Sequence, residues 1–249
     1  MQQSNTYIIV FSGILTILLG GLLSITSVVL KPTQDKQVDL DTKKKILSAV
    51  TDISSILEAD SILSLYDKKI ESFIVDYKGN LTTTDQRGNE ITAEKVNIQK
   101  NSKLPTEKRN YPVFLYKNET GKIQAYVFPM FGSGLWDWIS GFVALDNSFN
   151  EILGIAFDHR QETPGLGARI TDASVQNRYQ GKQIFNGSEL ISVTMVKGEG
   201  NTGLTDYEVD GLSGATLTAK GVNNMLKKYL ECYLPYIQKV KTGNKLVVN

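Results

Sequence analysis

The chain has 249 residues and a formal net charge of +1 at pH 7, so it lacks the basic field by which proteins bind nucleic acids. It has one cysteine, Cys232, which excludes an internal disulfide, and one histidine, His159. Zinc and iron–sulfur sites usually need several Cys or His ligands. Any redox chemistry in this protein would therefore use an organic cofactor.

The N-terminal segment 1–32 is expected to be a membrane anchor. No charged side chain occurs in the first thirty residues, and a long apolar run extends from Tyr7 to Leu30. As a helix this run would be about 36 Å long, enough to cross a hydrocarbon core of about 30 Å. A cleaved signal peptide usually has a basic start and a shorter apolar stretch. The sequence therefore predicts a retained transmembrane helix in a lipid bilayer.

Small residues recur along one face of this predicted helix, at Ser12, Thr16, Gly20 and Ser24. Small side chains at this spacing let a second helix approach closely in lipid. Two interpretations stay open: the anchor docks against the helices of a partner, or small polar residues are simply tolerated in an anchor.

Basic residues follow the predicted helix and none precedes it. They are Lys31, Lys36 and Lys43 to Lys45, with Asp35, Asp39 and Asp41 between them. Acidic residues contribute little to the positive-inside rule, so the lysines favour a cytoplasmic position for the domain that follows.

Residues 33–110 are expected to form a helical and irregular connecting region. Apolar residues between Gln34 and Leu57 recur at mostly three- and four-residue steps, which predicts an amphipathic helix leaving the membrane. A second helix or a strand is expected from Ile62 to Val75. Residues 78–110 are polar and rich in turn formers, and no element is assigned there.

Residues 111–249 are expected to form one domain. Two hairpins are predicted, over 111–130 with a turn at Asn118 to Gly121 and over 141–159 with a turn at Asp146 to Asn150. A helix over 168–179 and a strand over 189–198 should follow.

The domain is predicted to close with a helix over 218–240, whose apolar side carries Val222, Leu226, Tyr229 and Tyr233. Pro235 should kink or end this helix, and Cys232 should be a packing residue on it. The order of elements predicts an α+β fold with an antiparallel or mixed sheet and flanking helices.

The stretch DGLSGAT, from Asp210 to Thr216, gathers hydroxyls and small residues just before the closing helix. Backbone N–H groups at a helix start favour an anion, and Gly214 and Ala215 would let a phosphate approach the backbone. The hydroxyls of Ser213, Thr216 and Thr218 can donate to a phosphate or form an ester with it. Alternatively, Thr216 or Thr218 only caps the helix.

Two further loops add surface suited to a planar ring. In the first loop, residues 132–138 (GSGLWDW), Leu135 and Trp136 come directly after a glycine turn. The second loop, residues 159–169 (HRQETPGLGAR), has both polar and apolar side chains at its tip. The candidate residues of the second loop are Glu162, Thr163, Leu166 and Gly167. Together the loops supply apolar surface, backbone donors and glycine access. Alternatively, the tryptophans anchor the core and the second loop is only a connector.

DGLSGAT resembles the flavinylation motif Asp-Gly-x-Ser/Thr-Gly/Ser-Ala-Thr of FMN-binding-domain proteins, and GSGLW and ETPGLGA match the same domain in the expected order. With the N-terminal anchor and the length, nearly the whole chain resembles the family of C subunits of the Na⁺-translocating NADH:quinone oxidoreductases (NQR). In these proteins a flavin transferase joins FMN through its phosphate to the final threonine of the motif.

The resemblance implies that Thr216 is the covalent FMN acceptor, with Thr218 as the rival. Asp210, Ser213 and Gly214 would serve recognition by the transferase and shape the turn, and the residues of the other two loops would tune the redox potential of the flavin ring.

The resemblance also implies an electron carrier between an iron–sulfur centre and the flavin of the B subunit, on the way to quinone. Its partners would be the A, B, D, E and F subunits of NQR, and the isolated chain should have no turnover.

The family places its flavin domain on the periplasmic side of the bacterial inner membrane, against the indication of the lysines. Two alternatives remain: the corresponding covalent-FMN protein of the Rnf ferredoxin:NAD⁺ complex, and an anchored scaffold module without flavin. The length and the segment before Tyr111 favour NQR over Rnf.

Overall fold

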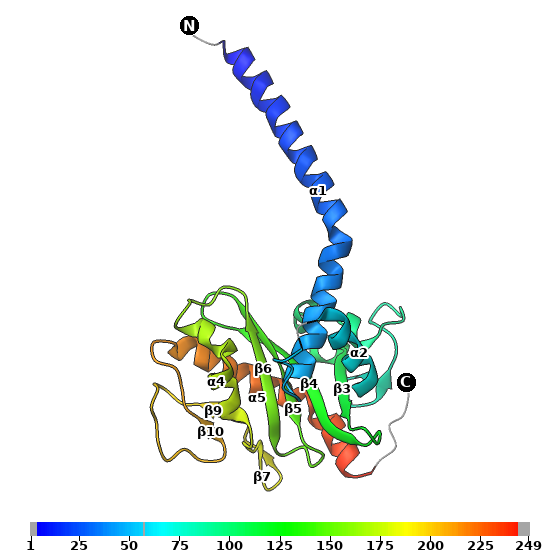
Figure 1. The fold of residues 1–249 in the computed structure, drawn as a ribbon, viewed down its shortest axis with the longest axis vertical. Coiled ribbons are helices and arrows are strands. Elements are labelled where there is room, and N and C mark those ends of the chain that lie inside the picture. The colour runs from blue at the N-terminus through cyan, green and yellow to red at the C-terminus, as the bar shows by residue number, and fades with distance from the viewer. Residues whose placement is uncertain (1–3, 57, 244–249) are drawn as a thin grey trace. The chain divides into compact units, whose positions relative to one another are not determined.

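The computed structural model describes residues 4–56 and 58–243. The chain forms two compact units, Met1–Thr42 and Lys43–Asn249. The helix α1 (Asn5–Ser48) makes up the first unit, and its last turns belong to the second. Figure 1 shows the ribbon and labels many of its helices and strands.

In the first unit, α1 is long and apolar enough to cross a membrane, as predicted. Its large apolar side chains from Tyr7 to Leu30 are exposed. The hydroxyls of Thr16 and Thr26 donate to the carbonyls of Ser12 and Leu22, four residues earlier in the helix. Because these hydroxyls are satisfied within their own helix, they are compatible with a lipid environment.

The amphipathic helix expected after the anchor is the continuation of α1 rather than a separate element. It ends at Ser48, and Leu57, expected at its end, lies outside the described residues. Ile46 and Leu47 are fully buried in the second unit. Beyond the helix, the carbonyl of Ala49 lies where a side chain on Gly154 would have to be, so a glycine in β6 allows the close approach.

A six-stranded antiparallel sheet forms the centre of the second unit, in the order β2-β1-β3-β4-β5-β6. Its strands are β1 (Ile70–Val75), β2 (Leu81–Thr82), β3 (Tyr111–Lys117), β4 (Ile123–Ser133), β5 (Trp138–Leu145) and β6 (Ile152–His159). The two predicted hairpins are confirmed as β3–β4 and β5–β6. The antiparallel sheet with flanking helices confirms the α+β fold class.

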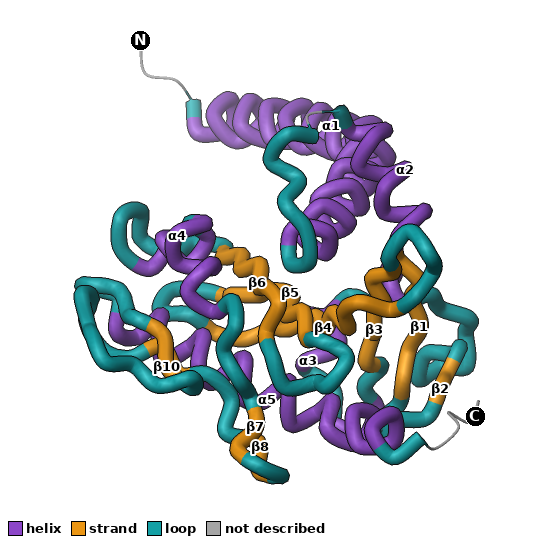
Figure 2. The backbone as a smooth tube through the Cα atoms, turned by 60° about the horizontal axis from the view of Figure 1, so that its bottom comes forward, coloured by secondary structure: helices purple, strands orange, loops and turns teal. Residues whose placement is uncertain are grey.

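Helices cover both faces of this sheet. In Figure 2, α5 (Thr216–Lys241) lies against one face and α2 (Ala59–Lys69) against the other. On the α5 side, alternate residues of β4 pack against the helix, and Phe128 lies 4.5 Å from Tyr233 between ring centroids. On the other side, the rings of Phe114 and Phe142 meet edge to face. The sheet therefore has two buried faces.

Residues 62–75 and the unassigned region 78–110 each contribute a strand to this sheet, β1 and β2. Residues 62–75, expected to be a helix or a strand, form both, since α2 runs directly into β1 and β1 pairs with β3 over its whole length. Short elements follow β2: η1 (Ala93–Lys95), α3 (Ile98–Ser102) and η2 (Thr106–Lys108). The pairing partner of β1 lies some forty residues later, which local patterns do not show.

Two of the predicted elements are interrupted. Residues 168–179 form η3 (Gly167–Thr171), α4 (Ala173–Gln176) and η4 (Asn177–Tyr179), because Asp172 adopts an extended conformation. The strand expected over 189–198 is broken where Ser192 has a φ of 70°. The short strands of this region are β7 (Phe185–Asn186), β8 (Glu189–Leu190), β9 (Thr194–Met195) and β10 (Glu208–Val209).

The closing helix α5 is longer than predicted, beginning at Thr216 and continuing through Pro235 to Lys241. The four residues expected on its apolar side are buried, and Cys232 packs beside the core. A proline inside a helix costs about 3 kcal/mol. Tyr233, Tyr236 and Ile237 are buried around Pro235, so packing outweighs the lost helix hydrogen bond.

Candidate functional site

The DGLSGAT stretch is the turn that leads from β10 into α5. Gly214 has a φ of +72°, which side chains other than glycine rarely adopt. Leu212 and Ala215 are buried beneath the turn, while Ser213, Gly214 and Thr216 are exposed. The turn therefore presents the Thr216 hydroxyl at the first residue of a 26-residue helix.

The two candidate threonines have different surroundings. Thr216 is exposed and, among the described residues, its hydroxyl makes no hydrogen bond. Thr218 is 1% exposed, and its hydroxyl donates to Glu162 Oε2 at 2.5 Å. The position that precedes the helix is Ala215, and it provides no side-chain cap. The interpretation of either threonine as the helix cap is therefore wrong, and the N–H groups at the start of α5 are available to an anion.

A network of charged residues, Glu199, Arg169 and Arg178, is hydrogen-bonded to the start of the turn of residues 210–216. Glu199 accepts two hydrogen bonds of 2.8 Å from Arg169 and one of 3.0 Å from Arg178. Arg178 also donates to the carbonyls of Asp210 and Gly211, at 3.0 and 2.6 Å. The carboxylate of Asp210 accepts from the backbone of Gly200 and Asn201. The carboxylate of Asp210 therefore stabilises the loop, and both of its oxygens already accept hydrogen bonds within the chain.

This network makes stability depend on pH in the acid range. Hydrogen bonds from Arg169 and then Arg178 lower the pKa of Glu199 to about 2, and the backbone of Gly200 does the same for Asp210. In the unfolded chain these groups titrate at about 4.3 and 3.9. Because the folded pKa is the lower one, the stabilisation is complete above those values and is lost as the pH falls toward about 2.

We therefore expect Glu199→Gln to flatten the loss of stability on acidification. Thermal unfolding of the wild type and the variant at pH 6 and pH 3 measures this. Glu189→Gln, at an exposed carboxylate, is the matched control. Equal acid sensitivity of Glu199→Gln and wild type would contradict the assignment.

The GSGLW and ETPGLGA loops meet at a single buried carboxylate, that of Glu162. Its Oε1 atom accepts from the backbone N–H groups of Leu135 and Trp136, at 2.9 and 3.1 Å. The indole N–H of Trp136 donates to Thr163 Oγ1 at 3.1 Å. Trp136 is exposed, so it does not anchor the core as one interpretation had it, whereas Trp138 is half-buried beside Phe131.

Exposed apolar side chains gather around this turn. Among the described residues of the second unit, the exposed large ones are Leu135 at 44%, Trp136 at 67%, Leu166 at 41% and Leu217 at 58%. Leu166 lies beside Gly214, where an added Cβ would come within 2.8 Å of it. Sequence reasoning missed Leu217, although its position between the two threonines was a signal. Leu166 and Leu217 lie beside the turn of residues 210–216, and Leu135 and Trp136 are connected to α5 through Glu162. We call these four exposed side chains the exposed apolar rim.

Glycines let the three segments approach one another. A Cβ on Gly134 would overlap Glu162 Oε1, and one on Gly167 would lie 2.5 Å from both Glu162 Oε2 and Thr218 Oγ1. A Cβ on Gly221 of α5 would overlap the carbonyl of Ser133. Gly134 and Gly221 were not among the predicted site residues. Gly134 lets the first loop lie against Glu162, and Gly221 lets it lie against α5.

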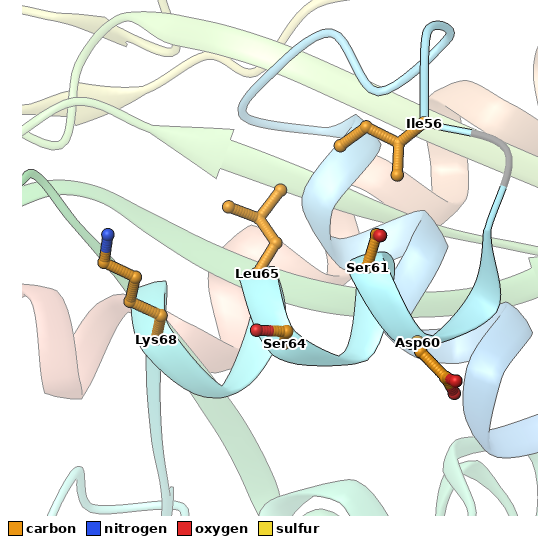
Figure 3. Close-up of a pocket in the computed structure, with 6 residues that line it drawn as sticks. All are labelled: Ile56, Asp60, Ser61, Ser64, Leu65 and Lys68. Carbon is orange, nitrogen blue, oxygen red and sulfur yellow. The ribbon is translucent and has the colours of Figure 1, made fainter.

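A separate open groove of about 490 Å³ lies on α2. Figure 3 shows its lining residues, Ile56, Asp60, Ser61, Ser64, Leu65 and Lys68. It shares no residue with the three loops, so the sequence motifs and the exposed apolar rim, rather than this groove, define the candidate site.

A known protein family matches the part of the chain that contains most of these residues. Residues 134–231 match the FMN-binding domain family. The chain is 34% identical to the C subunit of the Na(+)-translocating NADH-quinone reductase of Haemophilus ducreyi, over 92% of this chain and 91% of that one. It is 32% identical to the protein of the same name from Neisseria meningitidis serogroup B, over 94% and 95%.

Solved structures show the same fold. The crystal structure of the C subunit of this reductase from Parabacteroides distasonis superposes with a TM-score of 0.70 and 33% identity, covering 84% of this chain and 96% of that one. Shewanella oneidensis NqrC also gives a TM-score of 0.70, at 23% identity, over 83% and 99%.

Proposed function

The chain belongs to the family of C subunits of the Na⁺-translocating NADH-quinone reductases, and on this premise we propose that it carries FMN covalently on Thr216 as an electron carrier. Family membership and the matched domain make it an FMN-binding component of an oxidoreductase complex. The helix α1 fits membrane anchoring. The relatives favour this complex over Rnf, and the matched domain argues against a scaffold without flavin.

The observation that carries the proposal is the contrast between the two threonines. The hydroxyl of Thr216 is exposed, free of hydrogen bonds within the described part of the chain, and located at a helix start that favours a phosphate. The rival hydroxyl of Thr218 is buried and bound to Glu162. The exposed apolar rim offers apolar surface of the kind that one face of an isoalloxazine ring needs. These residues therefore fit the cofactor.

The ester would join Thr216 Oγ to the FMN phosphorus; in the net balance, the hydroxyl proton of the threonine and one hydroxyl group of the phosphate leave together as water. No histidine, lysine or carboxylate hydrogen-bonds to the Thr216 hydroxyl in the described residues, so activation of this oxygen falls to the flavin transferase. When bound, FMN supplies one-electron chemistry. The chain itself holds the phosphate at the helix start, presents apolar surface to the ring, and leaves the site open to partners.

A covalent tether suits such an open site. Leu135, Trp136, Leu166 and Leu217 are all more than 40% exposed, so a ring resting on them would be held weakly without a bond. The tether keeps the ring at a high effective concentration. We propose that electrons arrive from an iron–sulfur centre between membrane subunits and leave to the flavin of the B subunit, toward quinone. The complex would also contain the A, D, E and F subunits.

We also propose a division of the chain into an anchor (1–32), a connecting region (33–110), whose strands β1 and β2 join the central sheet, and the FMN-binding domain (111–249). The domain would lie on the periplasmic side of the bacterial inner membrane. A maleimide that does not cross membranes should label Lys122→Cys in a Cys232→Ser background in intact spheroplasts. Labelling only after lysis would place the domain in the cytoplasm.

The direct test of the cofactor proposal is the mass of the peptide that contains Thr216, from protein purified in its native host under denaturing conditions. A gain equal to FMN less one water supports it. An unmodified peptide from a host that has the transferase would favour the scaffold alternative.

A further inference from the structure

Three segments distant in sequence meet on the carboxylate of Glu162. This side chain is 4% exposed, and no ion pair to it is found in the described part of the chain. Burying a carboxylate is costly unless hydrogen bonds satisfy its oxygens. Here both oxygens are used, each toward a different segment. Such a residue is expected to hold those segments in one arrangement.

The Oε1 atom fixes the loop that carries Trp136. Two consecutive backbone N–H groups, of Leu135 and Trp136, donate to it at 2.9 and 3.1 Å. The indole N–H adds a third bond, to Thr163 on the same loop as Glu162. Since Gly132 and Gly134 precede these residues, the free loop would have many backbone conformations.

The Oε2 atom connects the same carboxylate to α5. It accepts from Thr218, two residues after Thr216. Glycines at 134 and 167 leave the space that the carboxylate occupies, since a Cβ at either position would collide with it. The side chain of Glu162 therefore connects the loop of the exposed Trp136 indole to the start of the helix that carries Thr216.

We propose that Glu162 and Thr218 are positioning residues that fix the orientation of Trp136 before any flavin is attached. That the fixed surface receives FMN rests on the function proposed above, whereas the hydrogen-bonded connection itself does not. If Trp136 and its loop are already ordered, binding of a ligand does not lower their conformational entropy further, and the binding free energy is more favourable. Thr218 therefore acts on the site without being an acceptor.

The first test uses the full chain made in a host without flavin transferase, with Trp138→Phe so that Trp136 is the single tryptophan and can be excited selectively over the tyrosines. The anisotropy of Trp136 and its quenching by acrylamide are measured for Glu162→Ala, Thr218→Val and Thr218→Ser. We expect lower anisotropy and stronger quenching in Glu162→Ala and Thr218→Val, and recovery in Thr218→Ser, which keeps the hydroxyl. Thr216→Val is the matched control and should match its parent.

Anisotropy and quenching at parental values in Thr218→Val would overturn the proposal. This variant keeps the shape of the side chain, so it decides the question even where Glu162→Ala does not fold. A Thr216→Val variant that still carried covalent FMN in a host with the transferase would refute the proposed acceptor and leave the Trp136 result intact. The two proposals therefore fail separately.

The second test is the midpoint potential of the flavin in protein matured with the transferase. We expect Thr218→Val to shift the potential and Thr218→Ser to restore it, because the apolar and polar groups beside the ring would move. A potential that stays at the wild-type value in Thr218→Val would overturn the claim that this pair positions the flavin surface.

Discussion

Replacing Thr216 by Ala is expected to abolish covalent FMN attachment completely, whereas replacing Thr218 by Val should leave the flavin bond in place. The reason is accessibility: Thr216 Oγ is exposed and unbonded in the described structure, while Thr218 Oγ is buried and already donates to Glu162. The measurement is in-gel flavin fluorescence and intact mass after expression with the transferase. Attachment should fall below detection in Thr216→Ala.

The substitution should not unfold the domain, because Thr216 contributes no buried side chain and no hydrogen bond in the residues described. Thermal unfolding without flavin is therefore the control, and the Tm should stay near that of the wild type. Thr216→Ser, which keeps an exposed hydroxyl, shows whether the transferase needs the methyl group. Covalent flavin that persists in Thr216→Ala would reassign the acceptor.

Replacing Gly221 by Ala is expected to destabilise the domain, although helix propensity alone predicts the opposite. In an open helix the change would stabilise by about 1 kcal/mol. Here the new Cβ would overlap the carbonyl of Ser133 and approach Gly134 Cα to 3.3 Å. Overpacking of this kind costs about 1–3 kcal/mol. We expect a Tm lowered by several degrees, since about 1 kcal/mol corresponds to ~2–4 °C in a domain of this size.

The same substitution should disturb the flavin site, because the displaced segment leads directly to Leu135 and Trp136. Trp136 fluorescence in the Trp138→Phe background reports this displacement. Lys220→Ala, at the exposed neighbouring position, is the matched control and should change neither the Tm nor the fluorescence. A Tm that rises in Gly221→Ala would show that the loop can move away at no cost.

Several parts of the molecule were predictable because their signals are local. The apolar run from Tyr7 to Leu30, the two hairpins with their turns, and the apolar side of α5 all follow from short-range periodicity. β1 was not predictable in this way. Its place in the sheet depends on pairing with β3, which lies far along the chain, and its own sequence suits a helix or a strand.

The sequence by itself determined the chemistry that is available: an anchor, a hydroxyl-rich turn before a helix, and two glycine-containing loops with apolar tips. Only the tertiary structure decided which hydroxyl is free and which is buried, since Thr216 and Thr218 are two residues apart on the same helix. The difference arises because Glu162, more than fifty residues away in sequence, is brought beneath Thr218 by the end of β6. Burial and hydrogen bonding depend on such distant segments, so composition and spacing cannot reveal them.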